Sequence, residues 1–344
     1  MDLQIDPKTF KAWLIGALSS EVKKGELLSR KIMGQSLVLF RDDEGRAIAL
    51  DGRCPHKGVS LAVGKLRHGE LECPYHGWRF NTEGSCTHVP SMAEGEELPC
   101  ASVPNFAVCE QDGWVWVYWG QSTTLERGKP PRYPKHENYR WFEFVREVKS
   151  PPHFILENSF DPVHANFVHG GILRDDPVQD VEAKITETPR GVLVSHTENR
   201  GKKSVFASYM PWILDEFKHS EELVLPFTAF VNAHYQTLHH MTILTCVPID
   251  DDTTRVFTRT GLHMGGFTFP AYLFFRAVTP FVIPQDVKIL ENQARAFKEY
   301  GGRYGHPRQA DVPAFWAMRA YRAFMDGKFQ AEAEPRTGQA VYRL

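Results

Sequence analysis

The segment Cys54-Pro-His56, followed by Cys73-Pro-Tyr-His76-Gly-Trp78, decides the organisation of this chain. Each of its two parts supplies one cysteine and one histidine within a glycine-containing loop. Two thiolates and two imidazoles can hold either a structural zinc ion or a [2Fe–2S] cluster. Zinc ligands usually come as paired cysteines and paired histidines. One of each per loop favours a cluster in which the cysteines bind one iron and the histidines bind the other.

The spacing Cys-x-His…Cys-x-x-His resembles that of Rieske domains. This resemblance implies a Rieske-type [2Fe–2S] cluster with four ligands, namely Cys54, His56, Cys73 and His76. The flanking sequence predicts a small β domain, because runs at 36–40, 47–50 and 113–119 are rich in strand-forming residues. A turn at 42–45 joins the first two runs as a hairpin. A structural zinc ion is the alternative for this site.

The length of the chain indicates two domains. Its 344 residues are many for one hydrophobic core. The proline-rich segment Arg127-Gly-Lys-Pro-Pro-Arg-Tyr-Pro134 is typical of a domain boundary. We therefore predict a Rieske domain at 1–126, a linker at 127–140 and a second domain at 141–344. We expect the second domain to be the catalytic domain, with a mononuclear non-haem iron, because of a resemblance to a known family.

Composition and charge narrow the class of protein. With 42% hydrophobic and 24% charged residues, the chain is typical of a soluble globular protein. A net charge of -2 gives no reason to expect nucleic acid as a partner. The apolar stretch 267–284 is broken by Arg276 and by prolines, so we interpret it as pocket or interface and not as a membrane span. The N-terminus lacks signal-peptide features, and cysteines outside the loops show no paired spacing, so we expect a cytoplasmic protein.

The second domain mixes strand-like and helical patterns. Strand-like runs lie at 191–196, 204–209, 229–238, 241–248 and 255–262, and their alternation indicates one antiparallel sheet. Helical patterns lie at about 154–168, 284–300 and 311–326. The predicted fold class is therefore α+β, an N-terminal all-β domain followed by an antiparallel sheet with helices.

A second candidate metal site lies in Glu157-Asn-Ser-Phe-Asp161-Pro-Val-His164-Ala-Asn-Phe-Val-His169-Gly-Gly. Two histidines near an acidic residue suggest the two-histidine, one-carboxylate set that binds non-haem iron(II). On a regular helix His164 and His169 would point about 140° apart, so they can share an ion only across a π-bulge or a helix end. Gly170-Gly171 favours a helix end. Two ordinary histidines near a helix end are the alternative.

The motif Glu-x-x-x-Asp-x-x-His-x-x-x-x-His, downstream of a Rieske loop, resembles the catalytic α subunit of Rieske non-haem iron oxygenases. The resemblance covers nearly the whole chain and implies a helix-grip-like catalytic domain. It also implies a third iron ligand, Asp286 in Pro284-Gln-Asp286-Val-Lys-Ile, at the opening of a long helix. An acid placed in a first helical turn by the helix dipole is the alternative reading of Asp286. Among members, the chain is similar to the homotrimeric monooxygenase branch, which includes vanillate O-demethylase, steroid hydroxylases and pheophorbide a oxygenases.

Asp161 has a different role in this family. The resemblance implies that Asp161 is catalytic by linking His76 of one subunit to His164 of the next in a homotrimer. Such a carboxylate orients both imidazoles and couples the two metal centres. The alternative is that Asp161 only caps local backbone.

The family resemblance implies a Rieske non-haem iron monooxygenase. It would use a [2Fe–2S] cluster, mononuclear Fe(II) and O2 to hydroxylate or oxidatively demethylate an aromatic or polycyclic substrate. No Gly-x-Gly-x-x-Gly fingerprint follows a strand, so we expect an external reductase or ferredoxin to supply the electrons. A cis-dihydroxylating ring dioxygenase and a Rieske electron-transfer protein without oxygenase chemistry are the alternatives.

The substrate cavity is predicted to be apolar and roomy. Its candidate lining residues are Phe227, Phe230, Met264, Phe267, Phe269, Tyr272, Phe274 and Phe275. Among the remaining histidines, three in an apparent strand pair could also face this cavity, namely His234, His239 and His240.

Overall fold

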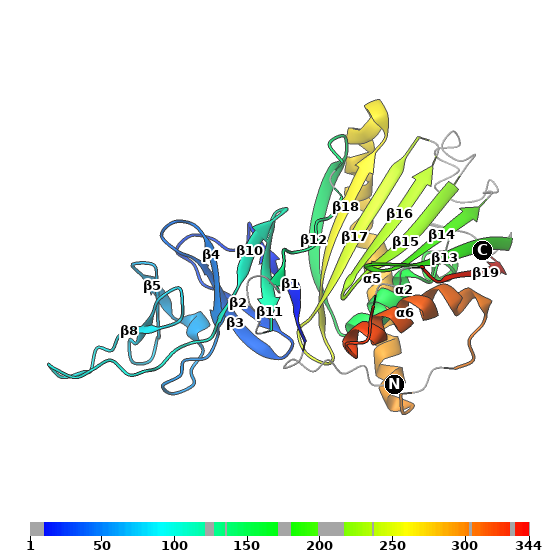
Figure 1. Cartoon of the computed structure of the whole chain (residues 1–344). Helices are drawn as coiled ribbons and strands as arrows, with labels where there is room; N and C mark the ends of the chain where they lie inside the picture. The colour runs from blue at the N-terminus through cyan, green and yellow to red at the C-terminus, as the bar shows by residue number, and fades with distance from the viewer. Residues whose placement is uncertain are drawn as a thin grey trace. The chain divides into compact units, whose positions relative to one another are not determined.

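The computed structural model describes residues 10–120, 127–134, 136–170, 180–198, 217–235, 237–302, 305–330 and 334–343. The predicted strand at 204–209 lies outside the described residues. The described residues divide into two compact units, with the boundary after Pro134 (Figure 1).

The N-terminal unit is all-β, as predicted. Its strands form three antiparallel sheets in the orders β1-β11-β10, β2-β3-β4-β9 and β5-β6-β7-β8. The predicted hairpin is the pair β3 and β4, and the predicted strand at 113–119 is β11. The elements are β1 (Ala12–Leu18), β2 (Leu28–Ile32), β3 (Gln35–Arg41), β4 (Ala47–Asp51), the 3-10 helix η1 (Leu61–Val63), β5 (Lys65–Arg67), β6 (Glu70–Glu72), β7 (Arg79–Phe80), β8 (Cys86–His88), β9 (Asn105–Phe106), β10 (Val108–Gln111) and β11 (Trp114–Trp119).

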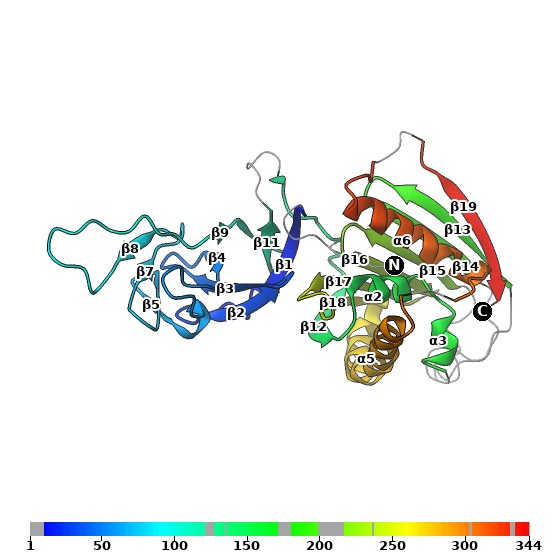
Figure 2. The ribbon, with the colours of Figure 1, turned by 90° about the horizontal axis from the view of Figure 1, so that it is seen from below.

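The C-terminal unit is built on one antiparallel sheet of eight strands in the order β12-β18-β17-β16-β15-β14-β13-β19. Figure 2 shows α2, α5 and α6 on the same side of this sheet. The predicted antiparallel sheet with helices is therefore confirmed. The strands are β12 (Arg140–Val148), β13 (Asp180–Thr188), β14 (Gly191–Glu198), β15 (Phe217–Val224), β16 (Thr228–Tyr235), β17 (His239–Pro248), β18 (Thr254–His263) and β19 (Thr337–Arg343). The helices are α2 (Pro152–Ser159), α3 (His164–Phe167), η3 (Gly265–Phe267), α5 (Thr268–Glu299), η4 (Gln309–Asp311) and α6 (Val312–Met325).

Helix α5 differs from the prediction, because it begins at Thr268 instead of near residue 284. It contains Pro280 and Pro284, which are exposed and lie four residues apart. Each proline removes one helical hydrogen bond, but on an exposed face water can satisfy the carbonyl that is left. Proline therefore does not end the helix here. Among the described residues, the segment 265–299 is the one helix long and apolar enough to span a membrane by length and composition, and little of its apolar window is buried.

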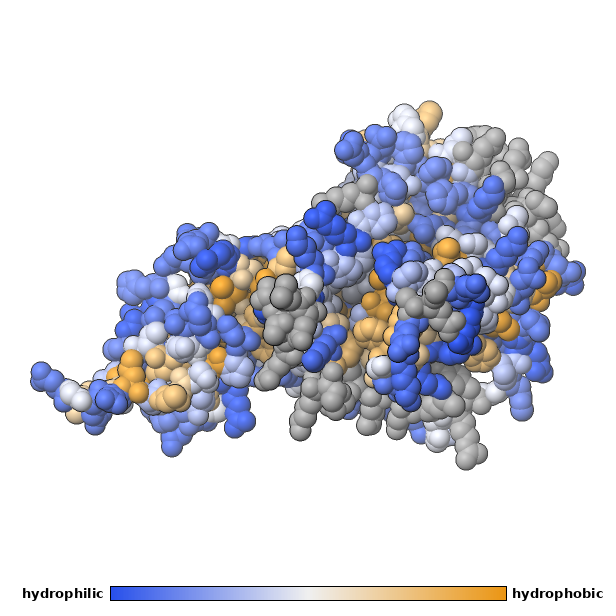
Figure 3. Space-filling model, in the orientation of Figure 1, coloured by the Kyte–Doolittle hydropathy of each residue, from blue (hydrophilic) through white to orange (hydrophobic). Residues whose placement is uncertain are grey.

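The two faces of α5 explain its unusual composition. One face packs towards β12 and β18 and buries Ala271 and Leu290. The opposite face exposes Phe269, Leu273 and Phe281. Elsewhere, on the side of the molecule seen in Figure 3, hydrophilic side chains predominate and hydrophobic ones form scattered patches.

Candidate metal centres

The two predicted cluster loops have the same backbone conformation. In the first, Cys54 N donates to Val59 O (2.9 Å) and Gly58 N donates to Cys54 O (2.9 Å). In the second, Cys73 N donates to Trp78 O (2.8 Å) and the N–H of the glycine after His76 donates to Cys73 O (3.1 Å). That glycine and its counterpart in the first loop both have positive φ angles, of 71° and 74°. Two equivalent loops can therefore hold a cluster from two sides.

The four side chains are arranged in pairs. Cys54 and Cys73 are buried, whereas His56 and His76 are exposed and their ring centroids lie 4.7 Å apart. Burial raises the pKa of the Cys54 thiol, while the backbone N–H groups of the loop oppose this. This geometry suits one inner iron bound by thiolates and one outer iron bound by imidazoles.

A single zinc ion fits this site less well. Zinc draws its donors to about 2.0–2.3 Å from one point. Among the described residues, two groups of three histidine, cysteine or acidic side chains bring their donor atoms within 4.8 Å of one another, and neither group includes a residue of the cluster loops. Donors that do not converge on one point favour a two-iron cluster over zinc.

A helix end lies between the two histidines of the second candidate site, which is one of the two arrangements that their spacing predicted. The pattern expected at 154–168 is split into α2, which ends at Ser159, and α3, which has four residues. His164 is the first residue of α3, and His169 follows its end. Their ring centroids lie 5.5 Å apart. A helix end, and not a π-bulge, therefore brings the two imidazoles together.

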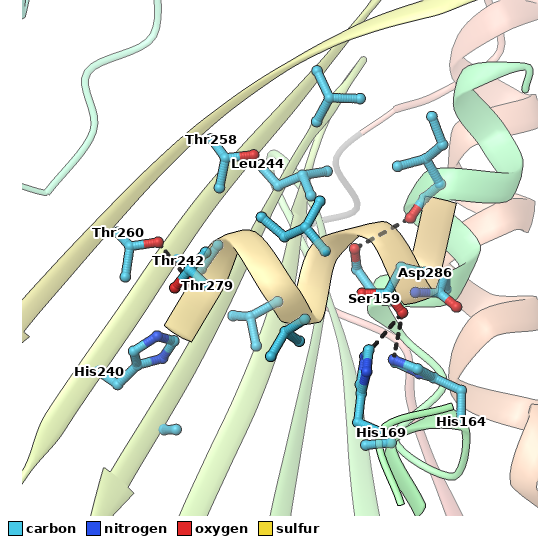
Figure 4. A pocket seen from close by; sticks show the side chains of 18 of the residues that line it. Ser159, His164, His169, His240, Thr242, Leu244, Thr258, Thr260, Thr279 and Asp286 are labelled. Atoms are coloured by element: carbon cyan, nitrogen blue, oxygen red, sulfur yellow. Dashed lines mark hydrogen bonds and ion pairs between the residues drawn. The ribbon is translucent and has the colours of Figure 1, made fainter. Parts of the chain in front are cut away.

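Both imidazoles face the carboxylate of Asp286. Its Oδ1 lies 3.6 Å from His164 Nε2 and 3.0 Å from His169 Nε2 (Figure 4). Two ligand atoms that each lie about 2.1 Å from the same ion, with a right angle or a wider angle between them at the ion, are roughly 3 Å or more apart. Among the described residues, none donates a hydrogen bond of good geometry to the buried Oδ1 of Asp286. A buried carboxylate oxygen facing two imidazole nitrogens fits a divalent cation.

The position of Asp286 corrects one expectation. It lies in the middle of α5, not at the opening of a helix, because α5 begins 18 residues earlier at Thr268. This also removes the alternative that Asp286 is an acid placed in a first turn by the dipole.

Neighbouring groups orient the two imidazoles. Gln285 Oε1 lies 2.8 Å from His169 Nδ1, and the backbone oxygen of Asp161 contacts His164 Nδ1. These partners leave each Nε2 directed at Asp286, as is usual for metal-binding histidines. Although burial opposes it, Asp286 and Gln285 raise the pKa of His169.

Asp161 serves the local backbone. Its Oδ1 accepts hydrogen bonds from Val163 N (3.0 Å) and His164 N (3.3 Å), which starts α3. Burial raises the pKa of Asp161, and His164 opposes this increase. The carboxylate is therefore partly engaged in capping, and a link to a second subunit would have to use its remaining acceptor capacity.

His164, His169 and Asp286 border a cavity of about 600 Å³. The cavity is enclosed by the sheet on one side and by α2 and α5 on the other, and its lining is mainly apolar. Polar groups on the sheet include His240, Thr242 and Thr260, of which the two threonine hydroxyls contact each other (Figure 4). Burial lowers the pKa of His240 to about 4, so its imidazole is neutral near pH 7.

The predicted cavity residues are only partly correct. Of the eight aromatic and methionine candidates, Phe274 and Phe275 line the cavity. Phe227 and Phe230 are core residues, and Phe269 is exposed like Phe267. Met264 and Tyr272 pack against a core cluster that includes Phe142 and Ala271, and neither is among the lining residues of the cavity.

The histidine predictions divide in the same way. His240 lines the cavity. His234 and His239 pair with each other across β16 and β17 and are not among its lining residues. The sequence analysis did not identify His219 and Glu221, which also line the cavity. They could have been found from the alternation of side chains along a strand, which places residues 219 and 221 on the same face of the sheet.

The fold and the two sites together define a class of protein, the oxygenases that join a Rieske domain to a domain with a two-histidine, one-carboxylate group. Comparison with known proteins agrees. Residues 12–107 match the Rieske [2Fe-2S] domain, and residues 148–330 match the vanillate O-demethylase oxygenase C-terminal domain. The chain belongs to the Rieske non-haem iron oxygenases, as an α-subunit type with a vanillate O-demethylase-like C-terminal domain.

Several relatives are oxygenase components. The chain is 31% identical over 255 residues to the 3-chlorobenzoate-3,4-dioxygenase oxygenase subunit of Comamonas testosteroni, covering 71% of this chain and 57% of the relative. It is 30% identical over 176 residues to the dicamba O-demethylase oxygenase component of Stenotrophomonas maltophilia, covering 51% of each. The matched regions thus span less than two thirds of the length of these curated relatives.

Solved structures show the same fold. Dicamba monooxygenase bound to dicamba superposes with a TM-score of 0.78 at 21% identity, covering 94% of this chain and 99% of that chain. Pseudomonas putida CBB5 NdmA with caffeine gives a TM-score of 0.73 at 18% identity, covering 91% and 90%. At these identities the similarity establishes the fold.

Proposed function

We propose that this protein is a Rieske-type monooxygenase that uses O2 and externally supplied electrons to hydroxylate or oxidatively demethylate an aromatic or polycyclic compound. The observation that carries the proposal is the convergence of Asp286, His164 and His169 at the wall of a mainly apolar cavity of about 600 Å³. A cavity of this size suits a ring-containing substrate, and its few polar groups can fix the orientation of that substrate.

The residues fit two cofactors. Cys54, His56, Cys73 and His76 would hold the [2Fe–2S] cluster, and His164, His169 and Asp286 would hold Fe(II). When bound, these groups would supply single electrons and activate O2. The protein's own part is to orient the ligands through Gln285 and to exclude water from the substrate.

The finer features follow the family pattern and are part of the proposal. Residues 1–126 would form the Rieske domain, 127–140 the linker and 141–344 the catalytic domain. Asp161 would link His76 of one subunit to His164 of the next within a homotrimer. A reductase or ferredoxin would deliver electrons, and we expect the protein to work in the cytoplasm.

The names of relatives support an aromatic substrate. One relative is a dicamba O-demethylase component and another is a 3-chlorobenzoate dioxygenase subunit. The second name supports ring dihydroxylation as the competing function. A Rieske protein that only carries electrons is disfavoured, because it would need neither the convergent histidines nor the cavity.

The decisive experiment compares Asp286→Ala with the wild-type protein. We expect the variant to retain the visible spectrum of the Rieske cluster, to lose the mononuclear iron and to lose substrate-dependent O2 uptake. A panel of methoxylated, N-methylated, steroidal and unsubstituted aromatic compounds would be tested with a reductase. Formaldehyde release indicates demethylation, and a cis-diol product indicates dioxygenation. If Asp286→Ala still oxidises a substrate, the assignment of the iron site is wrong.

A further inference from the structure

The cavity beside the proposed iron ligands contains a histidine whose imidazole has no hydrogen-bond partner among the described residues. His240 lies on β17 and lines the cavity. Its ring contacts the ring of Phe275 on α5, with centroids 5.4 Å apart. The side chain is half-buried, and its nitrogens are not among the fully enclosed polar atoms that lack a partner. The imidazole nitrogens can therefore meet a ligand in the cavity.

Two hydroxyl groups lie beside this imidazole. Thr242 is two residues from His240 on β17, so both side chains lie on the same face of the sheet. Thr242 pairs with Thr260 on β18, and their Oγ1 atoms are 3.3 Å apart. One hydroxyl can donate to the other, which leaves the hydrogen of the second available to a ligand. The three side chains line the cavity and lie together in Figure 4, and we call them the His–Thr patch.

The His–Thr patch is far from the proposed iron ligands along the cavity. In Figure 4, His240 and Thr260 lie on one side of the view and Asp286 lies on the other. Phe275, the ring neighbour of His240, precedes Asp286 by eleven residues on α5, which is about 16 Å along a helix axis. The groups bound at each end occupy a few ångströms, so a ligand that reaches both ends must span roughly 10 Å.

The imidazole of His240 carries no charge near pH 7. Its burial lowers its pKa to about 4, and the neutral ring offers one N–H donor and one acceptor nitrogen. It can therefore bond to a hydroxyl or a carbonyl oxygen. A carboxylate is a poor ligand there, because a buried anion requires a nearby cation. His219, two strands away in the same row, already lies 2.8 Å from the carboxylate of Glu221.

The arginines of β12 do not supply that cation. Arg140, two strands from His240, lies over the ring of Phe269, 5.0 Å from its centroid, and is not among the lining residues of the cavity. Arg146 lines the cavity but pairs with Val256 on β18. That position is six residues from the one opposite His240, or about 20 Å along the strand. The His–Thr patch is therefore suited to an uncharged oxygen.

We propose that His240 determines substrate specificity by hydrogen bonding to a hydroxyl or carbonyl oxygen at the end of the substrate remote from the iron site. Thr242 and Thr260 supply a second partner for the same oxygen. The inference rests on the proposed function, because it places the reacting end of the substrate beside the iron ligands. It narrows the substrate class to compounds of two or more linked or fused rings with an uncharged oxygen roughly 10 Å from the reacting carbon. Single-ring benzoates fall outside this class.

The test measures binding by equilibrium dialysis with the oxidised, metal-loaded protein. The probes are 4-methoxybiphenyls with a hydroxyl, acetyl, methyl or carboxylate group at the 4′ position, so that the two substituents lie at opposite ends of two linked rings. We expect wild-type protein to bind the hydroxyl and acetyl compounds at least about tenfold more tightly than the methyl compound. The carboxylate should bind no more tightly than the methyl compound, because the patch is uncharged.

Variants of the patch test the role of the imidazole. His240→Leu should bind the hydroxyl, acetyl and methyl compounds with similar affinity. His240→Asn or His240→Gln should restore part of the preference, because an amide keeps a donor and an acceptor near Nδ1 or Nε2 of the imidazole. Thr260→Val should reduce the preference by a smaller factor, since it removes only the second partner. His239→Leu is the matched control, because His239 lies next to His240 on β17 but outside the cavity lining, and it should leave all affinities unchanged.

The proposal is overturned if wild-type protein shows no preference for the hydroxyl and acetyl compounds, if none of the biphenyls binds, or if His240→Leu keeps the preference. Tightest binding of the carboxylate would indicate recognition by a cation and would also contradict it, as would the failure of both amide variants to restore any preference. Folding of each variant is verified by the cluster spectrum and the melting temperature. Failure of the proposed oxygenase function would appear separately, as an absence of O2 uptake by the reduced protein.

Discussion

His169 Nε2 lies 3.0 Å from Oδ1 of Asp286, although one residue follows a four-residue helix and the other lies in the middle of α5. The contact joins the two segments that carry the proposed iron ligands. Gln285, the neighbour of Asp286 in the sequence, contacts the other nitrogen of the same imidazole. One turn of α5 therefore supplies both a proposed ligand and the group that orients another.

We predict that Gln285→Leu weakens iron binding by about 10- to 100-fold, because His169 loses the partner that fixes its tautomer and ring orientation. The measurement is the iron retained at the mononuclear site during titration with a ferrous chelator, while the Rieske spectrum serves as an internal reference. Gln339→Leu, an exposed change on β19, is the matched control. Unchanged iron retention in Gln285→Leu would show that Gln285 does not orient the ligand.

Asp161 can be tested in a way that preserves its capping role. Asparagine keeps a side-chain oxygen that can accept the N–H groups of Val163 and His164. We therefore predict that Asp161→Asn retains both metals and its melting temperature but slows turnover at least about tenfold, if the negative charge couples the two centres. Single-turnover reduction and product formation would be measured. Asp161→Ala should in addition lose about 1 kcal/mol of stability.

If Asp161→Asn kept full activity, the only function of Asp161 would be to cap the start of α3. The oligomeric state would be measured with the same protein, since the proposed link operates between subunits. A homotrimer of 39.3 kDa chains has a mass of about 118 kDa.

Sequence was sufficient for the local features of both sites. The one-cysteine, one-histidine pattern of each loop agrees with two backbone-equivalent loops. The spacing of His164 and His169 predicted a π-bulge or a helix end between them, and α3 ends between them. These predictions succeed because they depend on neighbours within a few residues. The pairing of Asp286 with His169 spans far more sequence, so Asp286 could be named only through the family resemblance.

The errors also have physical causes. The start of α5 was missed because prolines usually end a helix, whereas here they lie on an exposed face. Strand β15 was missed because His219 and Glu221 occupy inward positions where alternation predicts apolar residues. Such departures from local pattern are expected where a residue serves a binding site.

The two cluster loops should respond differently to the same substitution. Both glycines at the loop tips have positive φ, so alanine strains either loop by about 1 kcal/mol or more. A Cβ at Gly77 would lie 2.9 Å from Cγ of Pro90, a rigid neighbour. At Gly58 it would lie 3.2 Å from the Arg53 side chain, which can move. We predict that Gly77→Ala loses more cluster absorbance per chain than Gly58→Ala. Equal loss would contradict this reading.

Stability at acidic pH should depend on Glu221. Its pKa in the folded protein is about 2, below the ordinary value of 4.5, so ionised Glu221 contributes stability that is complete above pH 4.5 and is lost as the pH falls towards 2. A shift of this size corresponds to about 3 kcal/mol. We predict that the melting temperature of wild-type protein falls more steeply between pH 5 and pH 3 than that of Glu221→Gln, whose side chain does not titrate. Glu222→Gln, a change on the same strand at a half-buried position, is the control. If the wild-type and Glu221→Gln slopes agree, the buried carboxylate is not held ionised by its two neighbouring imidazoles.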